Sequence, residues 1–194
     1  MPVIYTAGDL SALRTAAYAY LKRKRVKHVQ GCETEAYTLA QKYGADPLKA
    51  SVAAILHDIT KSLNLTNQLI LCDRYDIICD DIEKKSASLL HSKTGACMAR
   101  ELFDIEQSVF DAIWWHTTGR ANMSLLEKII YHADYIEPSR DFDGIDILRR
   151  TASVNLDAAI ALGLKMSIED IHSKGFPLHP KTTEAYEYYK EYLN

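Results

Sequence analysis

Apolar residues recur along this 194-residue chain at the three- and four-residue spacing of amphipathic helices, with no convincing alternating strand pattern. Two helix starts are marked by caps: Asp46 before Pro47, and a capping box from Ser124 to Glu127. The spacing and the punctuating glycines and prolines predict further helices over 9–24, 26–43, 66–75, 91–103, 106–118, 153–165 and 181–193. A short helix is expected from Ser167 and Asp170 to the closing Gly175. The pattern predicts an all-α fold.

The length of the chain fits one domain over residues 1–194, because this many residues can bury a stable core without cross-links such as disulfides. We find no internal repeat, low-complexity segment or linker that would divide it. The expectation is therefore a single helical bundle.

The segment 47–60 is the most informative of the predicted helices. Its residues 50–56 read Ala-Ser-Val-Ala-Ala-Ile-Leu, and a helix that is apolar on every face belongs in the middle of a domain. The same helix then carries His57 and Asp58. A carboxylate removed from water at the negative end of a helix dipole is unfavourable, so a cation should compensate it. A divalent metal bound by Asp58 and His57 would serve.

Helical phase places other polar residues on apolar faces, where they need partners. A lone inward histidine is more often a hydrogen-bonded core residue than a ligand, so the ordered set carries the prediction and no single member does. The residues that share apolar stripes are His28, His91, His116 and Asp134. Phase directs His132 away from the stripe and toward surface contacts. Core packing is favoured for His172 and a loop position for His179.

Composition narrows the function classes. A formal net charge of −3 argues against a broad nucleic-acid footprint, and the basic run 22–25 with Lys27 is interpreted as a solvated helix face. No signal peptide is expected in Met1–Leu10, and no apolar segment is long enough to span a bilayer. The four cysteines form no CxxC pair, which favours a reducing, cytoplasmic location; two of them read as small core residues, Cys32 and Cys97.

The ordered motifs resemble the HD superfamily of metal-dependent phosphohydrolases, and more closely its YqeK-type members, the symmetrical bis(5'-nucleosyl)-tetraphosphatases. His28, the pair His57-Asp58 and Asp134 match the set that holds one metal in the simplest members. His91 and His116 resemble the additional ligands of the dinuclear subset, in which the HD aspartate bridges two ions. The resembling segments cover 25–29, 57–61, 90–92, 115–119, 133–140 and 178–186. The departure from the pattern is His132, where a plain apolar residue would be expected.

The resemblance implies hydrolysis of diadenosine tetraphosphate (Ap4A) to two ADP by water activated between two metal ions. It favours iron, while imidazole and carboxylate ligands also suit manganese, cobalt, nickel or zinc. The implied metal ligands are His28, His57, Asp58, His91, His116 and Asp134. Asp58 and Lys61 are assigned to catalysis. The polyphosphate is expected to contact Arg25, Lys61, Thr117, Thr118, Gly119 and Arg140, which supply charge and hydrogen-bond donors.

Other functions stay open at this point. The same ligand set suits another HD-type nucleotidase or a cyclic-dinucleotide phosphodiesterase, and a paired iron site suits an HD-type di-iron oxygenase. A nucleotide-binding regulator without turnover is a third class. The partner expected in the hydrolase case is a small-molecule nucleotide, with neither nucleic acid nor membrane. A homodimer could form through the aromatic C-terminal helix, although packing on its own core is favoured for Tyr186, Tyr188, Tyr189 and Tyr192.

Overall fold

The computed structural model describes residues 6–193, which form α-helices and two short 3-10 helices, without a strand in that range. The all-α prediction is confirmed. In chain order the α-helices are α1 (Ala7–Tyr18), α2 (Arg23–Tyr43), α3 (Pro47–Leu56), α4 (Leu65–Arg74), α5 (Ala87–Phe103), α6 (Gln107–Trp115), α7 (Leu125–Ile136), α8 (Ile145–Ala152), α9 (Leu156–Ser173) and α10 (Pro180–Tyr189). The 3-10 helices are η1 (Glu83–Lys85) and η2 (Lys190–Leu193). No helix in this range is long and apolar enough to cross a bilayer.

The caps read from the sequence begin the two helices that matter most for the site. The Asp46 carboxylate accepts from the amides of Leu48 and Lys49 at 2.9 and 3.3 Å, which starts α3. Ser124 and Glu127 form the expected capping box at the start of α7. Each cap satisfies backbone N–H groups that have no partner within the helix, so these helix starts are determined locally.

Other boundaries differ from the predictions. The first helix ends at Tyr18 instead of continuing to 24, and α2 starts already at Arg23. The helix α8 follows Gly144, which takes the left-handed φ of 87°, and was not predicted. The separate helices 153–165 and 167–175 are one continuous α9. Its N-cap is Asn155, no residue inside it breaks the hydrogen-bond ladder, and Gly175 follows its end as expected.

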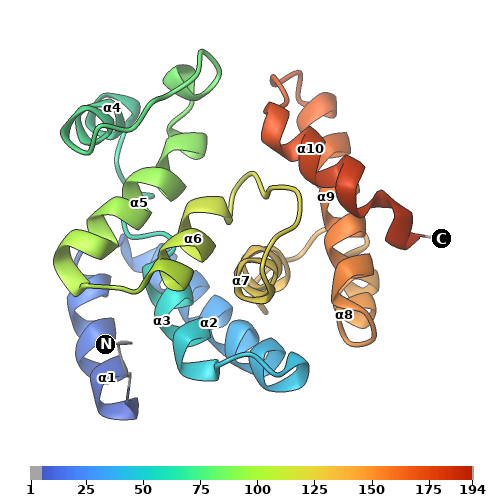
Figure 1. Ribbon diagram of the computed structural model, residues 1–194, viewed down its shortest axis with the longest axis horizontal. Coiled ribbons are helices and arrows are strands. Elements are labelled where there is room, and N and C mark those ends of the chain that lie inside the picture. Colours follow the sequence, from blue (N-terminus) through green and yellow to red (C-terminus); the bar gives the residue numbers. More distant parts are fainter. Residues whose placement is uncertain (1–5, 194) are drawn as a thin grey trace.

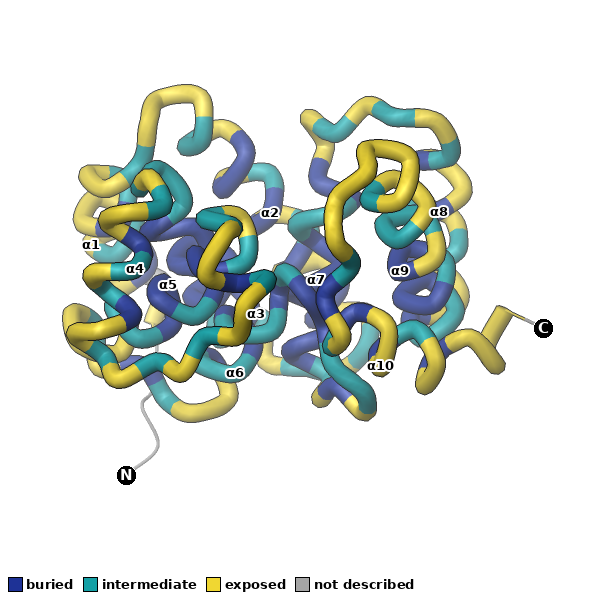
Figure 2. Tube along the Cα trace, turned by 90° about the horizontal axis from the view of Figure 1, so that it is seen from above, coloured by how far each residue is buried: buried dark blue, intermediate teal, exposed yellow. Residues whose placement is uncertain are grey.

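α3 lies in the middle of the bundle, as its uniformly apolar sequence predicts. It packs against α1, α2, α6 and α7, and every residue from 50 to 56 is buried. Figure 1 shows α7 beside these helices, with α8, α9 and α10 on its far side. Figure 2 shows that the buried stretches follow α2, α3, α5, α7 and α9 through the interior. A second, smaller core joins α7, α9 and α10 around Leu164 and Tyr189.

This packing on both sides of α7 overturns the prediction that His132 makes surface contacts. His132 is completely buried, because α8 and α9 cover the face of α7 opposite to the main core. The core position predicted for His172 is also wrong. The buried residues of α9 end at Leu164; the later turns of that helix are half-buried or exposed, and His172 is exposed. In α10, Tyr189 packs into the second core while Tyr188 stays exposed.

Candidate metal centre and substrate cleft

The six residues predicted as metal ligands come together from five separate segments. His28 lies near the start of α2, and His57 and Asp58 directly follow α3. His91 lies near the start of α5, His116 caps the end of α6, and Asp134 belongs to the last turn of α7. His57, His91, His116 and Asp58 are almost completely buried. The Asp134 side chain is 24% exposed.

Asp58 lies between two pairs of imidazoles. Its Oδ2 atom is 3.6 Å from Nε2 of His28 and 3.4 Å from Nε2 of His57. Its Oδ1 atom is 3.2 Å from Nε2 of His91 and 3.9 Å from Nε2 of His116. Each oxygen of a single carboxylate therefore faces one pair of ring nitrogens.

Asp134 joins the first of these pairs. Its Oδ1 atom is 3.1 Å from His28 Nε2 and 4.0 Å from His57 Nε2. The donor atoms of His28, His57 and Asp134 lie within 4.8 Å of one another, together with the sulfur of Cys32. Burial raises the pKa of the Cys32 thiol well above its usual value, so the protonated sulfur is a weak ligand beside the imidazoles.

Backbone hydrogen bonds orient three of the histidine rings. In each of them Nδ1 lies 2.7 Å from the carbonyl oxygen three residues earlier; the pairs are His57 with Ala54, His91 with Ser88, and His116 with Ile113. Nδ1 must donate in these bonds, so the neutral ring presents an acceptor at Nε2. This is the arrangement found around metal-bound histidines, where the second nitrogen is held by a neighbouring acceptor.

The Nε2 atoms point at one another and need a cation. Those of His91 and His116 are 2.9 Å apart, and two acceptor lone pairs at that distance repel. His57 Nε2 is buried and makes no hydrogen bond to any described residue. Imidazole and carboxylate donors without thiolate fit divalent transition metals, and bound ions would satisfy these nitrogens. The His/Asp clusters therefore fit divalent metal ions, and the chemistry does not choose one element.

The ionisation states of Asp58, Asp134 and His116 suit metal binding, whereas Asp58 raises the pKa of His57 against the effect of burial. Burial alone would raise the pKa of Asp58, but His57 and His91 together hold it well below its usual value. The pKa of Asp134 is likewise held low against burial, chiefly by the neighbouring His28 ring, whose Nε2 lies 3.1 Å from Oδ1. Burial, with His91 and His57 as neighbouring rings, lowers the pKa of His116 well below its usual value. The carboxylates are thus ionised and His116 is neutral, as ligands must be.

Glu137, which sequence reasoning missed, holds His28 in place. Its Oε1 atom accepts from Nδ1 of His28 at 3.0 Å, and its Oε2 atom accepts from the amide of Ser139 at 2.7 Å. Burial would raise the pKa of Glu137, but the hydrogen bonds from Ser139 and His28 lower it, so the carboxylate is ionised. The available signal was its position three residues after Asp134, on the same face of the helix end.

A buried polar network fixes the turn that carries Asp58. Thr60 donates to the carbonyl of His91 at 2.8 Å and shares a 2.9 Å hydrogen bond with Thr94. The side-chain amide of Gln68 donates from Nε2 to the backbone carbonyl of Thr60 at 2.8 Å. α3 itself ends at Leu56, four residues before the predicted end, so this network replaces the helical hydrogen bonds in positioning Asp58 beside His91.

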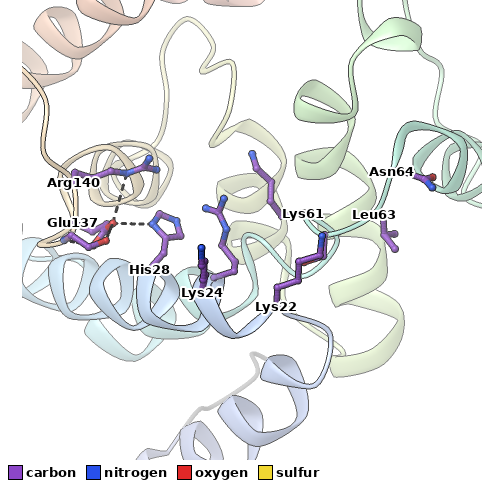
Figure 3. Close-up of a pocket in the computed structure, with 11 residues that line it drawn as sticks. Lys22, Lys24, His28, Lys61, Leu63, Asn64, Glu137 and Arg140 are labelled. Carbon is purple, nitrogen blue, oxygen red and sulfur yellow. Dashed lines mark hydrogen bonds and ion pairs between the residues drawn. The ribbon is translucent and has the colours of Figure 1, made fainter.

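A cleft of about 660 Å³ opens beside His28 and is rich in positive charge. Its cationic lining residues are Lys22, Lys24, Arg25, Lys61 and Arg140. Figure 3 shows Lys22, Lys24 and Lys61 between Arg140, Glu137 and His28 at one end and Asn64 at the other. Lys22, Arg23 and Lys24 of the basic run are exposed, as the solvated face predicts, and Lys22, Lys24 and the half-buried Arg25 also line the cleft. An anion in the cleft would be next to the His/Asp cluster.

The predicted phosphate-binding cations already contact the cluster. Arg25 Nη1 lies 3.0 Å from Asp58 Oδ2, and Arg140 Nη2 lies 2.7 Å from Asp134 Oδ1. Lys61 Nζ is 3.3 Å from His91 Nε2, and burial lowers the pKa of this ammonium. The three cations thus line the boundary between the cleft and the candidate ligands.

The three residues after His116 divide between the site and the core. The hydroxyl of Thr117 lies 3.4 Å from His91 Nε2, beside the cluster. The hydroxyl of Thr118 is buried and donates to the carbonyl of Gly119 at 2.9 Å. Gly119 has a left-handed φ of 65°, and a side chain there would meet Ala185. Of this segment, Thr117 is the residue placed to contact a ligand of the cluster.

Asp80, Glu83 and His179 form a separate cluster near the start of α10. His179, expected in a loop, caps α10 and is buried; its Nδ1 accepts from the amide of Lys181 at 3.1 Å. Nε2 must then carry the ring proton, and it lies 3.0 Å from Asp80 Oδ2 and 3.5 Å from Glu83 Oε1. A protonated Nε2 cannot ligate a metal, so this group joins α10 to η1.

Comparisons with known proteins agree with this geometry. The HD domain family model matches residues 25–139. Curated proteins called symmetrical bis(5'-nucleosyl)-tetraphosphatase are similar over most of their length. The protein of Halalkalibacterium halodurans is 42% identical over 86% of this chain and 89% of its own. Those of Bacillus subtilis (35%) and Staphylococcus aureus (31%) match 87% and 93% of this chain and 90% and 94% of their own.

A solved structure shares the fold. It is described as a predicted HD superfamily hydrolase involved in NAD metabolism from Clostridium acetobutylicum. The two chains superpose with a TM-score of 0.89 at 36% sequence identity, over 97% of this chain and 99% of the other. The similarity thus extends well beyond the segment that holds the His/Asp cluster.

Proposed function

This chain belongs to the HD-domain family, and on that premise we propose that it hydrolyses Ap4A symmetrically to two molecules of ADP. Curated relatives called symmetrical bis(5'-nucleosyl)-tetraphosphatase, at 31–42% identity, support the phosphoanhydride chemistry and the substrate. The observation that carries the proposal is the position of Asp58, whose two oxygens each face a pair of imidazoles beside a cation-lined cleft. Asp58 would hold metal ions together with these imidazoles, and the ions would supply an activated water.

The proposed metal ligands fall into two groups that share Asp58. One group contains His28, His57 and Asp134, and the other contains His91 and His116. Metal ions bound there, for which we propose iron, would lower the pKa of a water molecule and neutralise charge on phosphoryl oxygens. The nearby hydrogen bonds from Nδ1 atoms and the Glu137 carboxylate hold the donor atoms in position for this.

The cations of the cleft bind the polyphosphate. Arg25 and Arg140 each use part of a guanidinium on a cluster carboxylate and retain further N–H groups that can donate to phosphate oxygens. Lys61 lies beside both the cleft and His91, where its ammonium can stabilise the charge that develops on the transferred phosphoryl group. Thr117 offers a hydroxyl at the other edge of the cluster.

The reaction consumes one water and breaks one phosphoanhydride bond at the centre of the tetraphosphate. The water oxygen bonds to one central phosphorus, and the bridging oxygen leaves with the other half as ADP. Because a nucleoside diphosphate is a good leaving group, a strong general acid is less necessary.

The test is to measure metal content and Ap4A turnover for the purified protein and for Asp58→Asn. We expect ADP as the sole nucleotide product and a loss of both bound metal and turnover in the variant, because both ligand groups share this carboxylate. Asp111→Asn, at a half-buried residue of α6 that pairs with Gln107 and not with the cluster, serves as the matched control and should retain both. Release of AMP, or normal metal content and turnover in Asp58→Asn, would contradict the proposal.

A further inference from the structure

A second pocket, of about 560 Å³, lies against the other end of the His/Asp cluster. Thr117 and Ser88 line it, and both contact His91: the Thr117 hydroxyl is 3.4 Å from Nε2, and the Ser88 carbonyl accepts from Nδ1 at 2.7 Å. The cationic cleft instead adjoins His28. The cluster therefore has a hollow at each end, and the two hollows are lined by different side chains.

The second pocket is apolar and aromatic. Its lining residues come from the segment that begins α5, from α7, and from the junction of α9 with α10. Figure 1 shows the first of these segments in green and the last in orange to red. Its main apolar lining residues are Leu89, Tyr131, Tyr135, Ile171 and Phe176. Phe176 is 63% exposed at its rim, which leaves an aromatic face open to a ligand. A pocket of this size, mostly apolar with a few hydroxyl groups, suits a small organic molecule.

Charge separates the two hollows further. Five cationic side chains line the cleft beside His28, whereas Lys85 is the sole cation lining the described part of the second pocket. The pocket also contains Asp170, whose carboxylate pairs with Lys174 at 2.6 Å. A polyphosphate is favoured in the cleft and disfavoured in the pocket, while an uncharged planar group has aromatic surface to pack on only in the pocket.

We propose that this pocket binds one nucleoside of the substrate, with the base against Phe176 and Tyr135. This inference rests on the proposed function. The phosphate chain then passes Thr117, crosses the His/Asp cluster and continues into the cationic cleft with the other half of the molecule. A substrate with two identical halves is thus held asymmetrically, by aromatic packing at one end and by charge at the other.

Photolabelling of the metal-loaded protein with 2-azido-ADP tests the position directly. After irradiation and proteolysis, mass spectrometry should find the label on peptides that contain residues 131–135 or 171–182 of the pocket lining. Label confined to peptides with residues 22–25 and 61–64 of the cleft would overturn the inference. The readout does not need turnover. A protein that is labelled at the pocket but does not hydrolyse Ap4A would refute the proposed function and leave the pocket standing.

Two variants test the consequence for catalysis. Phe176→Ala removes the rim aromatic, and Ser167→Trp fills the pocket from α9. Since base stacking is worth about 1–3 kcal/mol, the KM for Ap4A should rise about 5-fold or more in each variant while kcat stays within about 2-fold. Ile147→Ala, at an exposed apolar residue of α8 outside the pocket, is the control and should keep the original KM. An unchanged KM in both pocket variants, with correct folding by circular dichroism, would overturn the inference.

Discussion

The hydrogen bond at Nδ1 decides which nitrogen of each site histidine faces the cluster. For His57, His91 and His116 the acceptor is a backbone carbonyl of the same turn, so the local helix geometry sets the ring. For His28 it is the carboxylate of Glu137, more than a hundred residues later in the chain. His28 is therefore the histidine whose orientation depends on a side chain that a substitution can change.

Glu137→Gln is expected to weaken metal binding without removing a ligand. An amide oxygen accepts from His28 less strongly than a carboxylate, so the apparent metal affinity should fall by about 10- to 100-fold. Competition with a coloured chelator measures this. Glu169→Gln on the exposed surface of α9 is the matched control and should bind metal as the original protein does. Equal affinities of the two variants would show that Glu137 does not support His28.

The buried His132 ring should make the folded protein less stable at acid pH. Burial lowers the pKa of this ring to about 4, whereas an unfolded chain would have the ordinary value of 6.5. Between pH 6.5 and 4 the unfolded state therefore binds more protons, and the free energy of unfolding falls as the pH falls, by about 3 kcal/mol for this group. Stability above pH 6.5 is unaffected by this titration.

The comparison of His132→Leu with the original protein isolates this effect. In urea unfolding from pH 7 to 4, the Leu variant should lose less stability than the original chain, because it lacks the buried titrating ring. The equivalent change at the exposed His172 should leave the original slope. Parallel pH profiles for His132→Leu and the original protein would contradict the expectation.

At the scale of elements, the site depends on how closely α2 approaches the end of α7. Gly31 makes this approach possible: a Cβ atom there would lie 2.5 Å from Oε2 of Glu137 and 3.2 Å from Cδ of Pro138. The helix thus tolerates a residue of low helix propensity at this position because a larger one would meet the carboxylate that orients His28. The lack of a side chain at Gly31 therefore allows both the close packing of α2 on the end of α7 and the orientation of His28 by Glu137.

Gly31→Ala should therefore perturb the metal site from a position that touches no ligand. We expect lower thermal stability and weaker metal binding, in the direction of Glu137→Gln, because Glu137 must move. Gly8→Ala in α1 is the control, since a Cβ there meets nothing closer than 3.7 Å and replaces glycine inside a helix. Gly8→Ala should leave the thermal stability unchanged or raise it slightly. Calorimetry and the same chelator competition provide both readouts.

At the scale of the whole molecule, charge is segregated. The chain carries a formal net charge of −3, yet five positive side chains gather around the cleft from α2 and its N-cap, the turn after α3 and the segment after α7. Such a concentration attracts a polyanion locally even though the protein as a whole is acidic. A local concentration of positive charge suits the small anionic substrate that we propose.

The double variant Lys22→Gln with Lys24→Gln tests this attraction. Both lysines line the cleft without touching the His/Asp cluster, so the KM for Ap4A should rise by about 3- to 10-fold with little change in kcat. The dependence of kcat/KM on salt should also become shallower. Lys42→Gln, at the far end of α2, removes one charge away from the cleft and should change neither quantity. Equal salt dependence in all three proteins would contradict the assignment.

Prediction from sequence succeeded where local chemistry dominates. Asp46 and Ser124 marked helix starts because a cap satisfies backbone groups within a few residues. The uniform apolar character of residues 50–56 located the central helix. The reading of His132 failed because helical phase identifies one buried face, and α7 is packed on two. Glu137 was missed because its importance comes from His28, a residue distant in sequence.

The sequence by itself determined the helical class, the central helix and the set of residues that could bind a metal, because periodicity, capping and ligand type are properties of short segments. The tertiary structure alone decided how these residues meet. It brought the oxygens of Asp58 to two pairs of imidazoles, gathered distant cations into one cleft, and opened an aromatic pocket at the other end of the cluster. Distances between segments depend on the packing of whole helices, and no local pattern contains them.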